Sequence, residues 1–184
     1  AAPALAEALQ VCKGSLKLVQ LGSHRFESAE AMNTVVKALC GCAQLGELDM
    51  TNSSLGEEGG AALKAVFETC PALHTIRLED CELGEEGCLV VADALGSLSK
   101  LREIDLRNND MEADSAEALG KSLDGKTSIE AVKLDEDLEE GADPVRSALE
   151  TMGKASALAL GDDDDDDDDD DAAVQSGGDD DEGG

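Results

Sequence analysis

The sequence predicts an α/β solenoid, a right-handed coil of repeats with parallel strands on its concave face and α-helices on its convex face. The first observation is an apolar pattern, L-x-x-L-x-L-x-x-N/C-x-L, that starts at residues 16, 45, 73, 101 and 129. The second is a helical apolar stripe between successive copies. The third is a run of aspartates over residues 162–171. We therefore predict a repeat domain over residues 1–160 and a disordered acidic tail over residues 161–184.

The strands follow from the L-x-L core of each copy. The clearest copies are LHTIRLEDCEL from Leu73 and LREIDLRNNDM from Leu101. LKLVQLGSHRF from Leu16 and LGELDMTNSSL from Leu45 precede them, and a weaker copy, IEAVKLDEDLE, follows from Ile129. The starts are 29, 28, 28 and 28 residues apart, so each copy predicts one short strand of a parallel sheet.

Between the copies, apolar residues recur at i, i+3, i+4, i+7 and i+8, which predicts a helix that packs behind the strands. The stripes are Gly59, Ala62, Leu63, Val66 and Phe67; Gly87, Val90, Val91, Ala94 and Leu95; and Ser115, Ala118, Leu119, Ser122 and Leu123. Gly59 and Gly87 would let neighbouring backbones approach closely. The acidic residues before these glycines, at 57–58 and 85–86, suit the positive end of a helix dipole.

The first residues, APALAEALQVC, read as a repeat helix whose own strand is missing. We expect its apolar face to be open, and we expect further repeats before Ala1 in the natural protein. No basic segment followed by an apolar one opens the chain, so we expect no signal peptide. The cysteines, which fall at apolar positions of the repeat, lead us to expect an intracellular protein.

At the other end, Asp137 and Glu139 replace the Asn/Cys and Leu of the pattern, as suits a final strand with no neighbour. Asp143 and Pro144 predict the N-cap and first residue of a closing helix over residues 144–153. Its expected inward residues are Val145, Ala148, Leu149 and Met152.

Composition excludes several functions. The net charge is −29, and residues 161–184 hold 14 of the 43 acidic residues and no basic one. We expect no nucleic-acid partner, because such binding needs Lys/Arg stripes and stacking aromatics, and Phe26 and Phe67 are the only aromatic residues. Anionic membrane is disfavoured by the same charge, and no apolar run is long enough for membrane insertion.

One segment, GKSLDGKT from Gly120 to Thr127, matches the phosphate-binding pattern G-x-x-x-x-G-K-[ST]. A phosphate-binding loop follows a strand and opens a helix. Here the order is reversed, because Leu119 and Leu123 belong to a helix that is ending and Gly125 suits its C-cap. We therefore predict a helix exit and no nucleotide cofactor.

The six cysteines, Cys12, Cys40, Cys42, Cys70, Cys81 and Cys88, fall at apolar positions of the repeat. We expect reduced, buried thiols in the core. Their spacing matches no paired C-x2-C zinc motif, and the two histidines are far apart, so no metal is expected. The sequence also lacks the G-x-S-x-G and HExxH motifs, and we expect no enzyme active site.

The strand residues that point away from the helices are the candidate partner-binding surface. They are Glu47, Asp49, His74, Thr75, Arg77, Glu79, Arg102, Glu103, Asp105 and Arg107. Rows of mixed charge across stacked strands are a usual way for a solenoid to recognise a protein. The alternative is that these charges are only solvated and paired with one another.

Repeats of 28 to 29 residues with a convex helix are leucine-rich repeats of the ribonuclease-inhibitor type. With the turns LGEEGG and LGEEGC, a degenerate last repeat and an acidic tail directly after it, the chain resembles the C-terminal half of Ran GTPase-activating proteins. The resemblance implies a crescent that binds the small GTPase Ran and speeds GTP hydrolysis without an arginine finger, in nucleocytoplasmic transport. It implies a location in the cytoplasm, including the nuclear envelope. It carries over no catalytic residue, and Asn109 reads as the structural asparagine of its repeat.

Two other readings stay open. One is an acidic chaperone of histones or other basic proteins, although repeats in that class are shorter and lack regular convex helices. The other is a sensor or inhibitor of the ribonuclease-inhibitor or immune-receptor kind. The tail itself is either a passive solvating end or a means of steering a basic partner surface.

Overall fold

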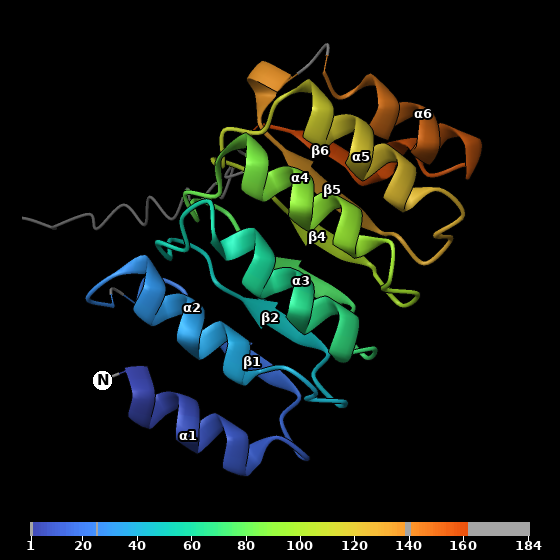
Figure 1. Cartoon of the computed structure of the whole chain (residues 1–184). Helices are drawn as coiled ribbons and strands as arrows, with labels where there is room; N and C mark the ends of the chain where they lie inside the picture. Colours follow the sequence, from blue (N-terminus) through green and yellow to red (C-terminus); the bar gives the residue numbers. More distant parts are fainter. Residues whose placement is uncertain (1, 25, 139–140, 162–184) are drawn as a thin grey trace, which may run out of the picture.

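The computed structural model describes residues 2–24, 26–138 and 141–161 (Figure 1). Strands and helices alternate along the described chain and stack in chain order. This confirms the predicted α/β solenoid. The tail predicted to be disordered lies outside the described residues, apart from Gly161.

The strands form one parallel sheet in the order β1 to β6. They span Leu18–Gln20, Glu47–Asp49, Thr75–Arg77, Glu103–Asp105, Ala131–Leu134 and Leu158–Leu160. Leu48 lies beside Ile76, Ile76 beside Ile104, and Ile104 beside Val132, so β2 to β5 keep the 28-residue register of the sequence.

The α-helices form a second layer that covers one face of the sheet (Figure 1). They are α1 (Ala2–Cys12), α2 (Ala29–Ala38), α3 (Gly59–Thr69), α4 (Gly84–Leu95), α5 (Ala113–Leu123) and α6 (Asp143–Thr151), with 3-10 turns η1 (Glu136–Leu138) and η2 (Ala155–Ala157). Among the described residues no helix lies on the other face of the sheet, which we call the concave face.

The core lies between the two layers. The middle residues of β2 to β5 and the stripe residues Leu63, Phe67, Leu95 and Leu119 are almost completely buried. The predicted stripes are thus largely confirmed, but Val90 and Ser122 are only half-buried. Cys88 and Ala116 occupy buried positions in their helices instead.

Asn109 joins two repeats as the sequence predicts. Its side-chain nitrogen donates to the carbonyls of Leu78 at 2.6 Å and Leu106 at 3.0 Å, and its oxygen accepts the Cys81 amide at 3.0 Å. The side chain is completely buried. It therefore satisfies backbone groups that the turn would otherwise leave unpaired in the interior.

Two expectations about the C-terminal end are wrong. The last repeat strand, β5, is not without a neighbour, because β6 pairs with it through Val132 and Leu158. A three-residue strand with no pattern of its own gives no periodic signal in the sequence. The closing helix begins at Asp143 and its N-cap is Ala142. Asp143, which we predicted to be the N-cap, is therefore the first residue of the helix.

Acidic residues near the helix starts act across repeats. The Glu85 carboxylate of α4 accepts the backbone amides of Glu112 at 2.6 Å and Ser115 at 2.9 Å, at the start of α5. Glu85 therefore caps the next helix rather than only favouring its own helix dipole.

Candidate protein-binding surface

The sheet register brings the predicted concave residues into rows. Glu47, Thr75 and Glu103 share one row, and Asp49, Arg77 and Asp105 share the next. The second row alternates in charge. The rows expected from the sequence therefore exist, although being in a row does not by itself leave a side chain free for a partner.

Arg77 and Glu103 form a bidentate ion pair within this surface. Arg77 Nε and Nη2 each donate to one carboxylate oxygen of Glu103 at 3.0 Å. Their side chains are 35% and 26% exposed. Such a pair is geometrically fixed, so it presents a shaped surface rather than a loose charge.

Arg107 lies under the surface rather than on it. Its guanidinium donates to Asp105 at 3.1 and 2.9 Å and lies 3.4 Å from Glu79. The Arg107 and Asp105 side chains are only 6% and 5% exposed. A buried charge with good partners has a structural role and is not available to a binding partner. Of the three side chains, Glu79 is the most exposed, at 23%.

The remaining predicted residues lie nearer the solvent. Arg102 pairs with Glu130 at 2.7 Å, with more than half of each side chain exposed, and its hydrogen bond lowers the pKa of the Glu130 carboxyl. His74 Nδ1 lies 3.0 Å from the Thr75 hydroxyl, which is itself buried. The pairing that the sequence left as an alternative therefore occurs at most of these positions.

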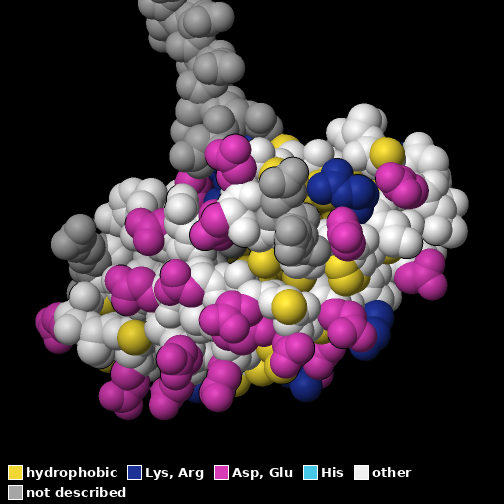
Figure 2. All heavy atoms as spheres, turned by 90° about the horizontal axis from the view of Figure 1, so that it is seen from above, with side chains coloured by type: hydrophobic (Ala, Val, Ile, Leu, Met, Phe, Trp, Pro, Cys, Tyr) yellow, Lys and Arg dark blue, Asp and Glu magenta, His cyan; other side chains and the backbone are white. Residues whose placement is uncertain are grey.

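A second surface was missed by the sequence analysis. It lies along the loops that lead from the strand ends to the helix starts, and we name it the acidic loop edge. Its exposed members are Glu57, Glu58, Asp80, Glu82, Asp110, Glu112, Glu136 and Asp137. Acidic side chains also dominate the face shown in Figure 2, where few Lys or Arg side chains appear. The signal was present in the sequence, because acidic residues occur in the loop after each of the repeat copies that start at Leu45, Leu73, Leu101 and Ile129.

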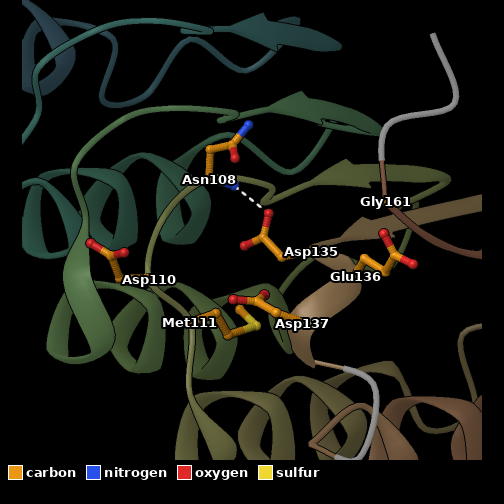
Figure 3. A pocket seen from close by; sticks show the side chains of 7 residues that line it. All are labelled: Asn108, Asp110, Met111, Asp135, Glu136, Asp137 and Gly161. Carbon is orange, nitrogen blue, oxygen red and sulfur yellow. Dashed lines mark hydrogen bonds between the residues drawn. The ribbon is translucent and has the colours of Figure 1, made fainter.

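A hollow of about 500 Å³ lies on the acidic loop edge, between the loops of the last two repeats. Asp110, Asp135, Glu136 and Asp137 line it, and Gly161 forms part of its rim (Figure 3). The backbone N–H of Asn108 donates to Asp135 Oδ1 at 2.7 Å. Among the described residues no group of three His, Cys, Asp or Glu side chains is arranged to hold a metal ion. The hollow therefore offers negative charge without a formed metal site.

The cysteines only partly match expectation. All six are free, and Cys42, Cys70, Cys81 and Cys88 are buried, but Cys12 is exposed and Cys40 is half-buried. Burial raises the pKa of the Cys81 and Cys88 thiols to about 12. The expectation is wrong for Cys12, because it ends α1 at the edge of the array, where no further repeat among the described residues covers it.

The phosphate-binding match is a helix exit, as predicted from its context. Helix α5 ends at Leu123, Asp124 is the C-cap, and Gly125 follows with φ of +72°. The Lys126 ammonium donates to the carbonyls of Gly96 at 3.1 Å and Leu98 at 2.8 Å. Lys126 therefore binds carbonyl groups just after the end of α4 in the preceding repeat and does not point at a phosphate site.

Comparison with known proteins agrees with this geometry. A family model described as Leucine Rich repeat matches residues 97–120. Mouse ribonuclease inhibitor is 32% identical over 110 residues, which are 56% of this chain and 24% of the inhibitor. The chain is a leucine-rich repeat protein of the ribonuclease-inhibitor type. Repeat arrays of this kind bind proteins through their extended surfaces, so the chain is a protein-binding module.

Two further leucine-rich repeat relatives match shorter stretches. Human protein NLRC5 is 29% identical over 90 residues, which are 49% of this chain and 5% of that protein. Chicken leucine-rich repeat-containing protein 45 is 33% identical over 88 residues, which are 48% of this chain and 13% of that protein. The chain thus spans less than a quarter of the length of each curated relative.

Solved structures show the same leucine-rich repeat fold. The tropomodulin C-terminal domain from Caenorhabditis elegans has a TM-score of 0.68 at 16% identity and covers 84% of this chain and 95% of its own. Leiomodin-1 actin-binding site 2 also has a TM-score of 0.68, at 14% identity, with 83% and 90% coverage.

In the described part of this chain, no helix has the length and apolar character needed to cross a membrane.

Proposed function

We propose that this leucine-rich repeat module is part of a GTPase-activating protein for Ran and acts by binding Ran through its crescent, in nucleocytoplasmic transport. Its proposed location is the cytoplasm, including the nuclear envelope. The observation that carries the proposal is the joining of a 28-residue repeat array to a run of ten aspartates directly after the last strand. The relatives named above share the repeat but are not named as activators of Ran.

The proposed mechanism needs no catalytic group from this chain. A rigid crescent can order the catalytic machinery that the GTPase itself carries, because orientation alone contributes a large share of a rate enhancement. The concave ion pair Arg77–Glu103 supports this, since paired side chains lose little freedom when a partner docks, and the buried pair Arg107–Asp105 holds the strands beneath it.

The acidic loop edge supports a basic partner surface. Gly161 lies at the rim of the acidic hollow and directly precedes the aspartates in the sequence. Charge of one sign raises the rate at which an oppositely charged partner associates, and the effect falls with salt. We propose that the edge and the tail steer a Lys- and Arg-rich surface of Ran toward the crescent.

Single-turnover GTP hydrolysis by Ran tests the activity, with the longest natural form of the protein as the activator. Hydrolysis should be faster than the intrinsic rate, and hydrolysis by Ras, used as a control GTPase, should be unchanged. An unaltered Ran rate would overturn the proposal. Comparison with the same protein ending at residue 161 tests steering, since association should slow at low salt and differ little at high salt.

The second candidate function is inhibition of a ribonuclease, favoured by the match to mouse ribonuclease inhibitor. Inhibition of a ribonuclease without any effect on Ran would replace the leading proposal. An acidic histone chaperone is disfavoured, because regular helices α2 to α6 follow β1 to β5.

A further inference from the structure

The two loop edges of the sheet carry opposite charge. Because the strands are parallel, all of them begin at one edge and end at the other. Ten acidic side chains and one basic one lie in the described loops that follow β2 to β5, at residues 50–58, 78–83, 106–112 and 135–138. Four basic side chains and two acidic ones lie in the loops that lead into β3 to β6, at residues 70–74, 96–102, 124–130 and 152–157. We name these four basic side chains, Lys100, Arg102, Lys126 and Lys154, the basic loop edge.

The basic loop edge is continuous across neighbouring strands. The backbone N–H of Glu130 donates to the carbonyl of Arg102 at 2.7 Å, where β4 and β5 begin side by side. Arg102 Nη2 donates to both carboxylate oxygens of Glu130, at 2.8 and 2.7 Å. The pKa of the Glu130 carboxyl is lowered by this hydrogen bond and also by the charge of Lys154, so Lys154 lies near it. The cations of successive loops therefore lie beside one another.

Much of this positive charge is not used within the described chain. The Arg102 side chain is 52% exposed, and its Nε and Nη1 groups have no acceptor among the described residues. Lys100 is exposed, and its ammonium forms no hydrogen bond or ion pair with a described residue. Lys126 differs, since its ammonium binds two backbone carbonyls. In a chain with 43 acidic and 14 basic residues, cations without a carboxylate partner are unusual and remain available to another molecule.

The chemistry of the basic loop edge favours carboxylates over nucleic acid. Ammonium and guanidinium groups pair with carboxylates, and the exposed hydroxyls of Ser99 and Thr127 in the same loops add neutral donors. No aromatic side chain lies in these loops, so bases have no group on which to stack. Asp124 and Glu130 lie among the cations and would repel a continuous phosphate backbone. A protein segment with spaced Asp or Glu side chains meets fewer such repulsions.

We propose that the basic loop edge binds a carboxylate-rich segment of a partner protein. Arg102 binds one carboxylate through the donors that Glu130 leaves free, and Lys100 and Lys154 pair with further carboxylates of the segment. Strand β4 has three residues and is about 10 Å long, so a partner on the concave face can touch both loop edges, and their opposite charges fix its orientation. Binding at this edge does not depend on whether Ran is the partner of the crescent.

Amide NMR spectra of the 184-residue chain test this, with a peptide of alternating Glu and Ser, about twelve residues long, as the probe. Saturable shifts are expected at Lys100, Arg102 and Lys154 and their neighbours. Lys100→Gln should raise the apparent dissociation constant about three- to fivefold, the loss of one exposed ion pair. The matched control Lys64→Gln removes the same charge from an exposed position on α3 and should change it less than about twofold. Unchanged signals elsewhere would show that both variants remain folded.

Four results would overturn the proposal. One is the absence of shifts at millimolar peptide, and another is equal weakening by Lys100→Gln and Lys64→Gln, which marks an effect of net charge alone. A third is stronger binding of a single-stranded DNA of the same charge as the peptide, which would make the edge a phosphate site. The fourth is movement of the same signals on removal of residues 162–184 before any peptide is added, which would make the aspartate run of the chain itself the occupant.

Discussion

The two ends of the solenoid are built from the same repeat but are finished differently. At the C-terminal end, β6 pairs with β5, and α6 places Val145 and Leu149 completely in the core. At the N-terminal end, Leu5 and Leu9 of α1 are only half-buried. The comparison teaches that the period sets which side chains are apolar, whereas the neighbouring element sets how much of their free energy of burial is realised.

Thiol reactivity should show the largest difference between an end and the interior. Cys12 should react with a thiol reagent at least about a thousandfold faster than Cys81 or Cys88, because reaching these two buried thiols requires local opening that costs several kcal/mol. Mass spectrometry of the labelled peptides measures this, with Cys12→Ser as the control. At pH 9 the Cys81 and Cys88 thiols should still be protonated and slow to react in the folded protein, since burial raises the pKa of both to about 12. Equal labelling of Cys12 and Cys81 would contradict the described burial.

Truncating one leucine at each end should give the next largest difference. Leu149→Ala removes a completely buried side chain from α6 and should lower the free energy of unfolding by about 2–5 kcal/mol. Leu9→Ala, on the half-buried face of α1, should cost about 1 kcal/mol, because much of the leucine is already in water. Urea unfolding followed by circular dichroism measures both. Equal losses would mean that Leu9 is as well covered as Leu149.

Adding a methyl group at each end should give the smallest difference. A Cβ on Gly120 would lie 2.7 Å from the backbone of Pro144, where α5 meets α6, whereas a Cβ on Gly14 has nothing within 4 Å. Gly120→Ala should therefore lower the free energy of unfolding by about 1–3 kcal/mol through overpacking. Gly14→Ala should change it by less than about 1 kcal/mol. Thermal unfolding midpoints compare the two variants. A Gly120→Ala variant as stable as Gly14→Ala would show that α5 and α6 can move apart without loss of stability.

Much of the fold could be predicted because each repeat states its pattern several times. Positions such as Ile76 and Leu119 are buried where the period places them, and Asn109 bonds to the backbone as its slot predicts. Apart from Val90 and Ser122, which are less buried than their stripes predict, the failures fall at the ends, where the period stops. Strand β6 has no copy to compare with, and Cys12 occupies an apolar position that nothing in the described chain covers.

The candidate surface was harder to predict than the fold. The sequence placed Arg77, Asp105 and Arg107 on the concave face, but their availability depends on ion pairs to residues 2 to 28 positions away. Periodicity gives the row of each residue and not the direction of a long side chain within it. The acidic loop edge was predictable in principle, because acidic residues occur in the same loop of four successive repeats.

The repeat pattern is enough to predict the solenoid, the parallel register and the buried stripe, since a repeated pattern has one way of stacking that buries every copy. The pairing of the charges, the strand that covers one end and the place of the exposed apolar surface follow from the folded structure alone. These depend on contacts between residues far apart in the chain, such as Glu85 with Ser115 and β5 with β6, and no local pattern encodes such contacts.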